Sequence, residues 1–128
     1  HKGTSYRDAP LTCVGCHDPH SGEQTLLTSR TERCTKCHQN VRGPQVFEHP
    51  PAAENCSNCH DAHGSPVRNL LNVAQPVLCL QCHSIASNRH GRTGAASNAQ
   101  VVSGAVLRDC VACHGAVHGS STDQHLRH

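Results

Sequence analysis

The sequence predicts a mostly irregular fold with a few short α-helices and little or no β-structure. Hydrophobic residues make up 35% of the 128 residues, and ten of them are cysteines. There is one Tyr, one Phe, and no Trp or Met. Such a chain cannot build an ordinary hydrophobic core from its side chains. We therefore expect it to fold around apolar groups that are not side chains.

A five-fold repeated motif, Cys-x-x-Cys-His, indicates what those groups are. It is the attachment signature of c-type haem: the two thiolates bond to the haem vinyl groups, and the histidine becomes the proximal ligand of the iron. The motifs use every cysteine of the chain: Cys13, Cys16, Cys34, Cys37, Cys56, Cys59, Cys79, Cys82, Cys110 and Cys113. The predicted proximal ligands are His17, His38, His60, His83 and His114.

Five motifs predict five covalently bound haem c groups, about one per 26 residues. Five apolar macrocycles would replace the missing aromatic side chains. The predicted fold class is therefore a multihaem cytochrome c, with an irregular chain and a few short helices wrapped around a closely packed haem array. We expect one domain over residues 1–128, with no internal boundary.

Three other uses of paired cysteines fit less well. Zinc half-sites do not require His directly after the second cysteine, and here all five pairs have it. A disulfide framework gives no reason for these histidines. A thioredoxin-like redox motif would occur once, beside a βαβ pattern.

The chain is an internal repeat of about two and a half di-haem units. In each unit a motif is followed by a short polar link, a histidine, a small-residue turn, Leu-Leu and a second motif. Short helices are expected at residues 28–40, 76–86 and 103–114, and a small-residue loop at 91–99. Four prolines are expected to mark extended or turn segments: Pro44, Pro50, Pro51 and Pro66.

The second axial ligand of each iron decides the function. Met/His ligation is excluded because the chain has no Met, so histidine is the obvious supply. Three histidines follow a proximal histidine closely and precede a small-residue turn, and each can point at the haem of a neighbouring motif: His20, His63 and His118. Two more lie seven residues from a motif, His49 before Cys56 and His90 after His83.

These five distal histidines match the five haems in number. His1, His125 and His128 lie near the termini and are taken as spares, with His1 as the first substitute. If every iron has two histidines, none offers an open coordination site. We therefore expect an electron carrier and not an enzyme.

Charge and composition point to an exported protein without nucleic-acid partners. The formal charge of +2 becomes negative once haem propionates are counted, and the nine Arg and two Lys are scattered, with Arg suited to pairing with propionates. No segment approaches 18 consecutive apolar residues, so no transmembrane span is expected. The chain is taken as a mature product whose signal peptide has been removed. Covalent haem and heavy cysteine use predict a periplasmic location, with an extracellular one as the alternative.

Residues 11–119 resemble the multihaem c-type cytochromes with a doubled CXXCH pattern. The resemblance rests on CHDPHSG and CHDAHGS, each followed by Leu-Leu and a further motif, and on GPQVFEHPPAAENCSNCHDAHGS. The second stretch is similar to the pentahaem donor of periplasmic nitrite reductase. It is also similar to halves of decahaem cytochromes that are periplasmic or associated with a porin, although five haems differ from ten.

The resemblance implies electron transfer from a quinol-oxidising membrane partner to a terminal reductase or an extracellular acceptor. It also implies bis-His ligation, with distal ligands by position at His20, His49, His63, His90 and His118. Two other functions stay open. The chain could be a protomer of a larger haem-wire assembly, a filament or a membrane complex subunit, or it could be a haem reductase with one open iron.

We predict that the chain does not fold without haem. Produced without haem attachment and with its cysteines reduced, it should show no cooperative thermal transition by far-UV circular dichroism, because its side chains cannot form a core. A cooperative transition in the haem-free chain would contradict this prediction.

Overall fold

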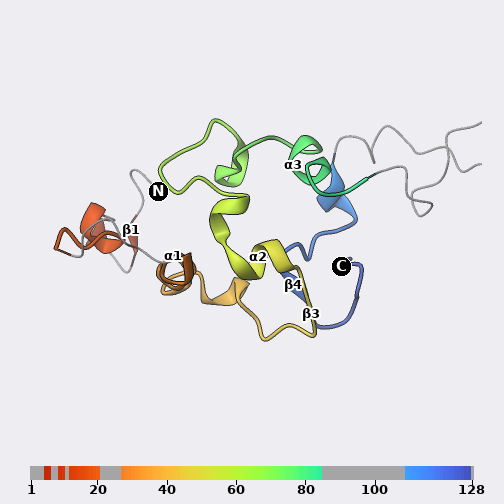
Figure 1. Ribbon diagram of the computed structural model, residues 1–128, viewed down its shortest axis with the longest axis horizontal. Coiled ribbons are helices and arrows are strands. Elements are labelled where there is room, and N and C mark those ends of the chain that lie inside the picture. The colour runs from red at the N-terminus through yellow and green to blue at the C-terminus, as the bar shows by residue number, and fades with distance from the viewer. Residues whose placement is uncertain (1–4, 7–8, 11, 21–26, 85–108, 128) are drawn as a thin grey trace, which may run out of the picture.

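The computed structural model describes residues 5–6, 9–10, 12–20, 27–84 and 109–127, which form short elements joined by irregular chain (Figure 1). The α-helices are α1 (Leu27–Thr35), α2 (Pro50–Glu54) and α3 (Val77–Leu80). The 3-10 turns are η1 (Cys13–Gly15), η2 (Gln39–Val41), η3 (Cys56–Asn58), η4 (Arg68–Leu70) and η5 (Cys110–Ala112). The strands are β1 (Ser5–Tyr6), β2 (Ala9–Pro10), β3 (Phe47–Glu48) and β4 (Gly119–Ser120). The predicted fold class, irregular with few short helices and minimal β-structure, is confirmed.

No hydrophobic side chain is buried among the residues for which burial is described. The buried side chains there are polar: Thr31 is 7% exposed and Ser120 is 6% exposed. Val14 and Val46 remain about 70% exposed, at 68% and 70%. The described part of the chain is thus held by hydrogen bonds and turns, as a thin layer around a non-protein core would be.

The five motifs follow one another along the molecule. Figure 1 shows η1 at one end of the long axis, then α1, η3 and α3, with η5 beside α3. This spatial order is the order of the motifs in the sequence.

All five motifs have the same local conformation. In each, the N–H of the histidine donates to the carbonyl oxygen of the first cysteine at 2.8 to 3.0 Å, and the N–H of the second cysteine donates to the same oxygen at 3.2 to 3.3 Å. The surrounding elements alternate. Motifs one, three and five lie on the isolated 3-10 turns η1, η3 and η5, whereas motifs two and four begin near the ends of α1 and α3. This alternation matches the predicted di-haem unit.

The three helices expected from the sequence are present in shortened form or lie partly outside the described residues. Residues 28–40 contain most of α1, which ends at Thr35 and is followed by the turn η2. Residues 76–86 contain α3, for which Pro76 is the N-cap. Of residues 103–114 only those from 109 on are described, and they form η5; the expected loop at 91–99 lies outside the described residues.

The expectation that Pro50 and Pro51 mark an extended or turn segment is wrong. They begin α2, where the first-turn N–H groups have no intrahelical acceptor and proline therefore costs no hydrogen bond. The buried Thr31 hydroxyl of α1 donates to the Glu54 carbonyl at 3.1 Å, which fixes α2 against α1. This contact positions the segment that leads into motif three.

A short antiparallel pair, β3 with β4, joins the middle of the chain to its C-terminal part. Phe47 is opposite Ser120, and Glu48 is opposite Gly119. Gly119 has φ +136°, and a Cβ atom there would lie 2.6 Å from Cγ of Gln45. Glycine therefore allows this close approach. The strands β1 and β2 form a second antiparallel pair, with Ser5 opposite Pro10.

Within the described ranges, none of the helices has the length and apolar character needed to cross a membrane.

We predict that Gly119→Ala destabilises the haem-loaded protein more than Gly64→Ala does. Both glycines have a positive φ, +136° and +147°, so both substitutions carry backbone strain of about 1–3 kcal/mol. Only position 119 adds a clash, because a Cβ at Gly64 meets nothing within 4 Å. Denaturant unfolding of both variants measures the difference, and equal losses would show that the approach of Gln45 does not matter.

Candidate haem sites

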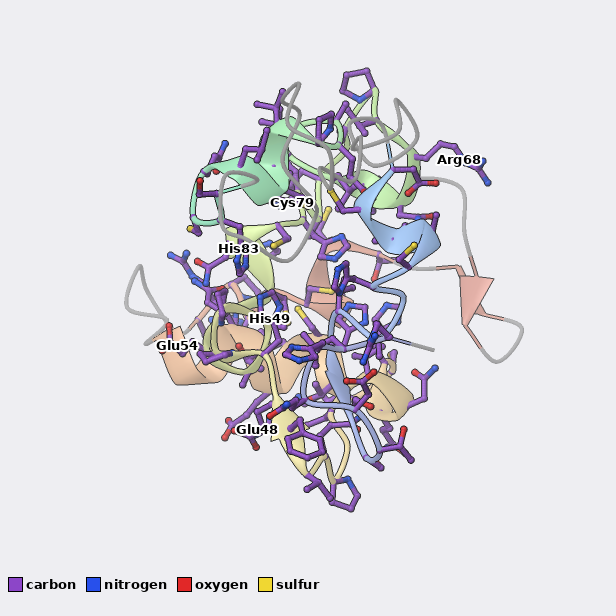
Figure 2. All side chains as sticks on the ribbon, turned by 90° about the vertical axis from the view of Figure 1, so that its right-hand side faces the viewer. Glu48, His49, Glu54, Arg68, Cys79 and His83 are labelled. Atoms are coloured by element: carbon purple, nitrogen blue, oxygen red, sulfur yellow. The ribbon has the colours of Figure 1, made fainter. Side chains whose placement is uncertain are left out.

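Three pairs of imidazole rings face one another across the described chain. The ring centroids of His17 and His63 are 5.8 Å apart, with ring planes 11° from parallel. Those of His60 and His118 are 6.2 Å apart at 16°. His49 and His83 lie 6.1 Å apart at 27°, and Figure 2 shows these two side chains next to each other.

Each pair contains one histidine from a Cys-x-x-Cys-His motif and one from outside the motifs. Ring contacts without a chemical cause would not be restricted to this combination. A metal with one proximal and one distal histidine requires it. The distal members are three of the residues predicted from the sequence: His49, His63 and His118.

The ring separation fits a metal shared by two imidazoles. Imidazole nitrogens bind metal ions at about 2 Å, so two opposed nitrogens are about 4 Å apart and the ring centroids about 6 Å apart. The observed separations of 5.8 to 6.2 Å agree with this arrangement. The residues present therefore fit iron that is held between two histidines, with the motif cysteines close by.

Backbone carbonyls fix which ring nitrogen is available to a metal. Nδ1 of His60 donates to the Asn69 carbonyl at 2.8 Å, and Nδ1 of His49 donates to the Val117 carbonyl at 2.8 Å. A carbonyl can only accept, so Nδ1 carries a proton in both rings, and Nε2 is the nitrogen left to face a metal. Such contacts to the second ring nitrogen are the usual support of a metal-binding histidine.

The loops after motifs three and five provide these carbonyls in the same way. Asn69 follows motif three and has φ +57°, and Leu70 after it has φ +56°. After motif five, Nδ1 of His114 donates to the His125 carbonyl at 2.6 Å, and Leu126 has φ +55°. In both loops the leucine carbonyl accepts a backbone N–H from the motif side, at 2.8 and 3.0 Å.

The β3–β4 pair brings two distal histidines together. His49 follows β3 directly, and His118 precedes β4 directly. Burial, and then the nearby His60 and His49, lower the pKa of His118 below its ordinary value. This shift favours the neutral form of the His118 imidazole, which is the form that binds metals.

Cysteine thiols of consecutive motifs lie against one another in the first half of the chain. Burial, and then the hydrogen-bonded Cys56 thiol, raise the pKa of Cys34, and Cys16 adds to the effect. Cys16, Cys34 and Cys56 belong to motifs one, two and three. The thiols of motifs two and three are therefore in contact, and that of motif one lies near enough to influence Cys34 electrostatically.

Similar electrostatic relations occur in the second half of the chain, with a thiol contact between Cys79 and Cys110. Burial and then Cys82 raise the pKa of Cys59, and burial and then Cys110 raise the pKa of Cys79 to about 11. Oε1 of Gln75 accepts from the N–H of Cys110 at 3.1 Å, which holds the start of motif five beside motif four. All five motifs are thus connected in sequence order. Among the residues the structure describes, no three or more His, Cys, Asp or Glu side chains gather as a metal cluster.

The structure shows which motif histidine two of the predicted distal histidines face. His63 and His118, which follow motifs three and five, do not face the haem position of an adjacent motif in the sequence. Each faces the proximal histidine two motifs earlier, His17 and His60.

The remaining predicted ligands are described in part. His20 has the same local turn as His63: its backbone N–H bonds Oδ1 of Asp18 at 2.9 Å, as that of His63 bonds Asp61 at 2.9 Å. Proximal His38 lies in its motif turn, and His90 lies outside the described residues.

Three residues that orient histidine rings through their backbone carbonyl groups were not predicted from the sequence: Asn69, Val117 and His125. Every residue has a carbonyl, so residue type gives no signal for Val117. Asn69 had a weak signal, since asparagine tolerates the left-handed conformation better than most residues. His125, taken as a spare ligand, contributes its backbone carbonyl instead.

Comparison with known proteins identifies the family of the chain. The family model described as "Doubled CXXCH motif" matches residues 7–43 and 49–88. The chain belongs to the doubled-CXXCH family. Over 120 residues it is 41% identical to the multiheme cytochrome MtrA of Shewanella baltica (strain OS185), an alignment that covers 88% of this chain and 36% of that protein. The chain thus spans about a third of the length of this relative, and it is a multihaem cytochrome that binds several c-type haems.

We predict that Asn69→Val disturbs the site of His60, whereas Asn69→Gly does not. Valine in the left-handed conformation costs about 1–2 kcal/mol, and glycine adopts it freely. Denaturant unfolding and the low-spin electron paramagnetic resonance (EPR) spectrum of the haem-loaded protein measure the effect. The prediction fails if both variants behave alike.

Proposed function

We propose that this chain binds five covalent haem c groups, each with two histidine ligands, and carries electrons along them. The three imidazole pairs are the observation that supports this proposal most directly. In each pair the distance between ring centroids is the one expected for two imidazoles that bind one metal through opposed nitrogens. Each pair joins a motif histidine to a predicted distal histidine. The proposed distal ligands include His49, His63 and His118 from these pairs, and His20 and His90 from the sequence.

Bound haem would supply a reversible one-electron centre at each motif. The chain's own residues would attach and orient it: ten cysteines as tethers, motif histidines as proximal ligands, and backbone carbonyls as supports for the rings. Two neutral imidazoles with donated Nδ1–H bonds favour low potentials, because no thioether is available to raise them.

The contacts between motif cysteines support conduction along the chain. Cys34 contacts Cys56, and Cys79 contacts Cys110, so groups attached to consecutive motifs would be neighbours. Since the motifs follow the long axis in sequence order, electrons could enter at motif one and leave at motif five, or the reverse (Figure 1). We propose that residues 1–128 form a single domain that conducts electrons through all five haems.

A carrier is favoured over a reductase because each imidazole pair would close both axial positions of an iron. Substrate would then have no coordination site at these irons. We further propose a periplasmic location. The proposed partners are redox proteins, a quinol-oxidising donor and a terminal reductase or extracellular acceptor. The relationship to a multiheme cytochrome supports redox partners of this kind.

We predict that methionine in place of a paired distal histidine changes one haem at a time. His49→Met, His63→Met and His118→Met should each raise the potential of one haem, about one-fifth of the redox titration, because Met/His ligation has a higher potential than bis-His. Spectroelectrochemical titration measures this.

His128→Met is the matched control, since His128 lies outside the repeat pattern and no haem should change. If the three variants titrate like the unmodified protein, the ligand assignment is wrong.

A further inference from the structure

His20 occupies the same place in the repeat as His63. Each ends an Asp-x-His segment directly after a motif histidine, Asp18 to His20 and Asp61 to His63. In both, the backbone N–H of the histidine bonds Oδ1 of that aspartate at 2.9 Å. His20 is therefore presented by the same turn that presents His63 to His17.

Two of the three imidazole pairs share one register. The histidine that follows motif three faces motif one, and the histidine that follows motif five faces motif three. His20 follows motif one. If it also faced a motif two positions earlier, that motif would have to precede the first motif of this sequence. All ten cysteines of the chain lie in motifs from Cys13 onward, so this sequence contains no such motif.

Motif two is a poor partner for His20 under the same rules. It begins near the end of an α-helix, as motif four does, and the proximal His83 of motif four is faced by His49 from the linker between motifs two and three. In these three pairs, a histidine that directly follows a motif faces the proximal histidine of a motif on a 3-10 turn. His49, which lies in the linker between two motifs, faces the proximal histidine of a motif that begins in a helix. His20 facing His38 would break both registers.

The location of this segment agrees with a partner beyond the chain. Figure 1 shows η1, which directly precedes this turn, at one end of the long axis. Residues 12–20 are all exposed. The chain also spans only 36% of its multiheme relative, so related sequence extends well beyond this length.

We propose that His20 is the distal ligand of a c-type haem that lies outside the five motifs of this chain. The haem would belong either to a preceding motif of a longer polypeptide or to a second copy of this chain. His20 would thus join two haem arrays into one conducting line. The inference rests on the bis-His ligation proposed above. It takes His20 away from the haems of its own chain, so one of the five would receive its second histidine from outside the chain or from His1, the first substitute.

The first test compares His20→Ala with His63→Ala in the haem-loaded 128-residue protein, measured as monomer. Carbon monoxide added to the reduced protein reports irons with an open site. His63→Ala should gain carbon monoxide binding at about one-fifth of the haem absorbance, and His20→Ala should match the unmodified protein. A gain of about one-fifth in His20→Ala would overturn the inference, because His20 would then serve a haem of its own chain. No gain in His63→Ala would instead overturn the ligand assignment itself.

The second test supplies an external haem. A ferric haem c peptide that carries one histidine and an open sixth position should become low-spin on binding the unmodified protein one to one. His20→Ala should abolish this spectral change, and the control His128→Ala should retain it. Binding that survives in His20→Ala would overturn the inference.

Sedimentation equilibrium separates the two sources. If a second copy supplies the haem, the unmodified protein associates head to tail and His20→Ala stays monomeric. If a preceding motif supplies it, both proteins are monomeric and the haem peptide still binds only when His20 is present. Absence of both association and peptide binding would contradict the proposal.

Discussion

The pairing of histidines across a shared metal position is the constraint on which this fold depends. The described chain buries no hydrophobic side chain, and its helices and strands are too short to hold one another in place. The imidazole pairs instead connect segments that are distant in sequence, such as His17 with His63 and His60 with His118. Because each connection passes through the proposed iron, folding and cofactor binding become one process, as in other proteins whose core is a metal site.

The repeat has two kinds of motif, and this alternation organises the proposed conducting line. Motifs one and three, both on 3-10 turns, each face a histidine that follows the motif two further along, and the helical motif four faces His49 from an earlier linker. Each unit is therefore completed by a neighbour, as in other repeat proteins whose units cannot close alone. Thiol contacts between Cys34 and Cys56 and between Cys79 and Cys110 bring consecutive motifs together. An array built this way can be extended by further haem motifs. The proposed role of His20, as ligand of a haem outside the five motifs, is one such extension.

The sequence predicted the kinds of residue at the site better than their partners. Cys-x-x-Cys-His identifies the tethers and the proximal ligands because the chemistry of haem attachment needs that spacing. The partner of a distal histidine depends on how the whole repeat folds, so His63 could not be assigned to His17 from spacing. The helix α2 was missed because Pro50 and Pro51 disrupt a helix interior but not its first turn. The carbonyls of Asn69 and Val117 orient the rings of two proposed ligands, and residue type does not reveal the role of a backbone carbonyl.

The most direct test of the shared-metal pairs is low-temperature EPR of the oxidised, haem-loaded protein, with spin quantification. The ring planes lie 11°, 16° and 27° from parallel. Nearly parallel imidazole planes on low-spin ferric iron give rhombic spectra, whereas perpendicular planes give a strongly anisotropic signal. The account predicts rhombic bis-His signals from at least three irons per chain. Fewer than three such irons, or high-spin iron in their place, would contradict it.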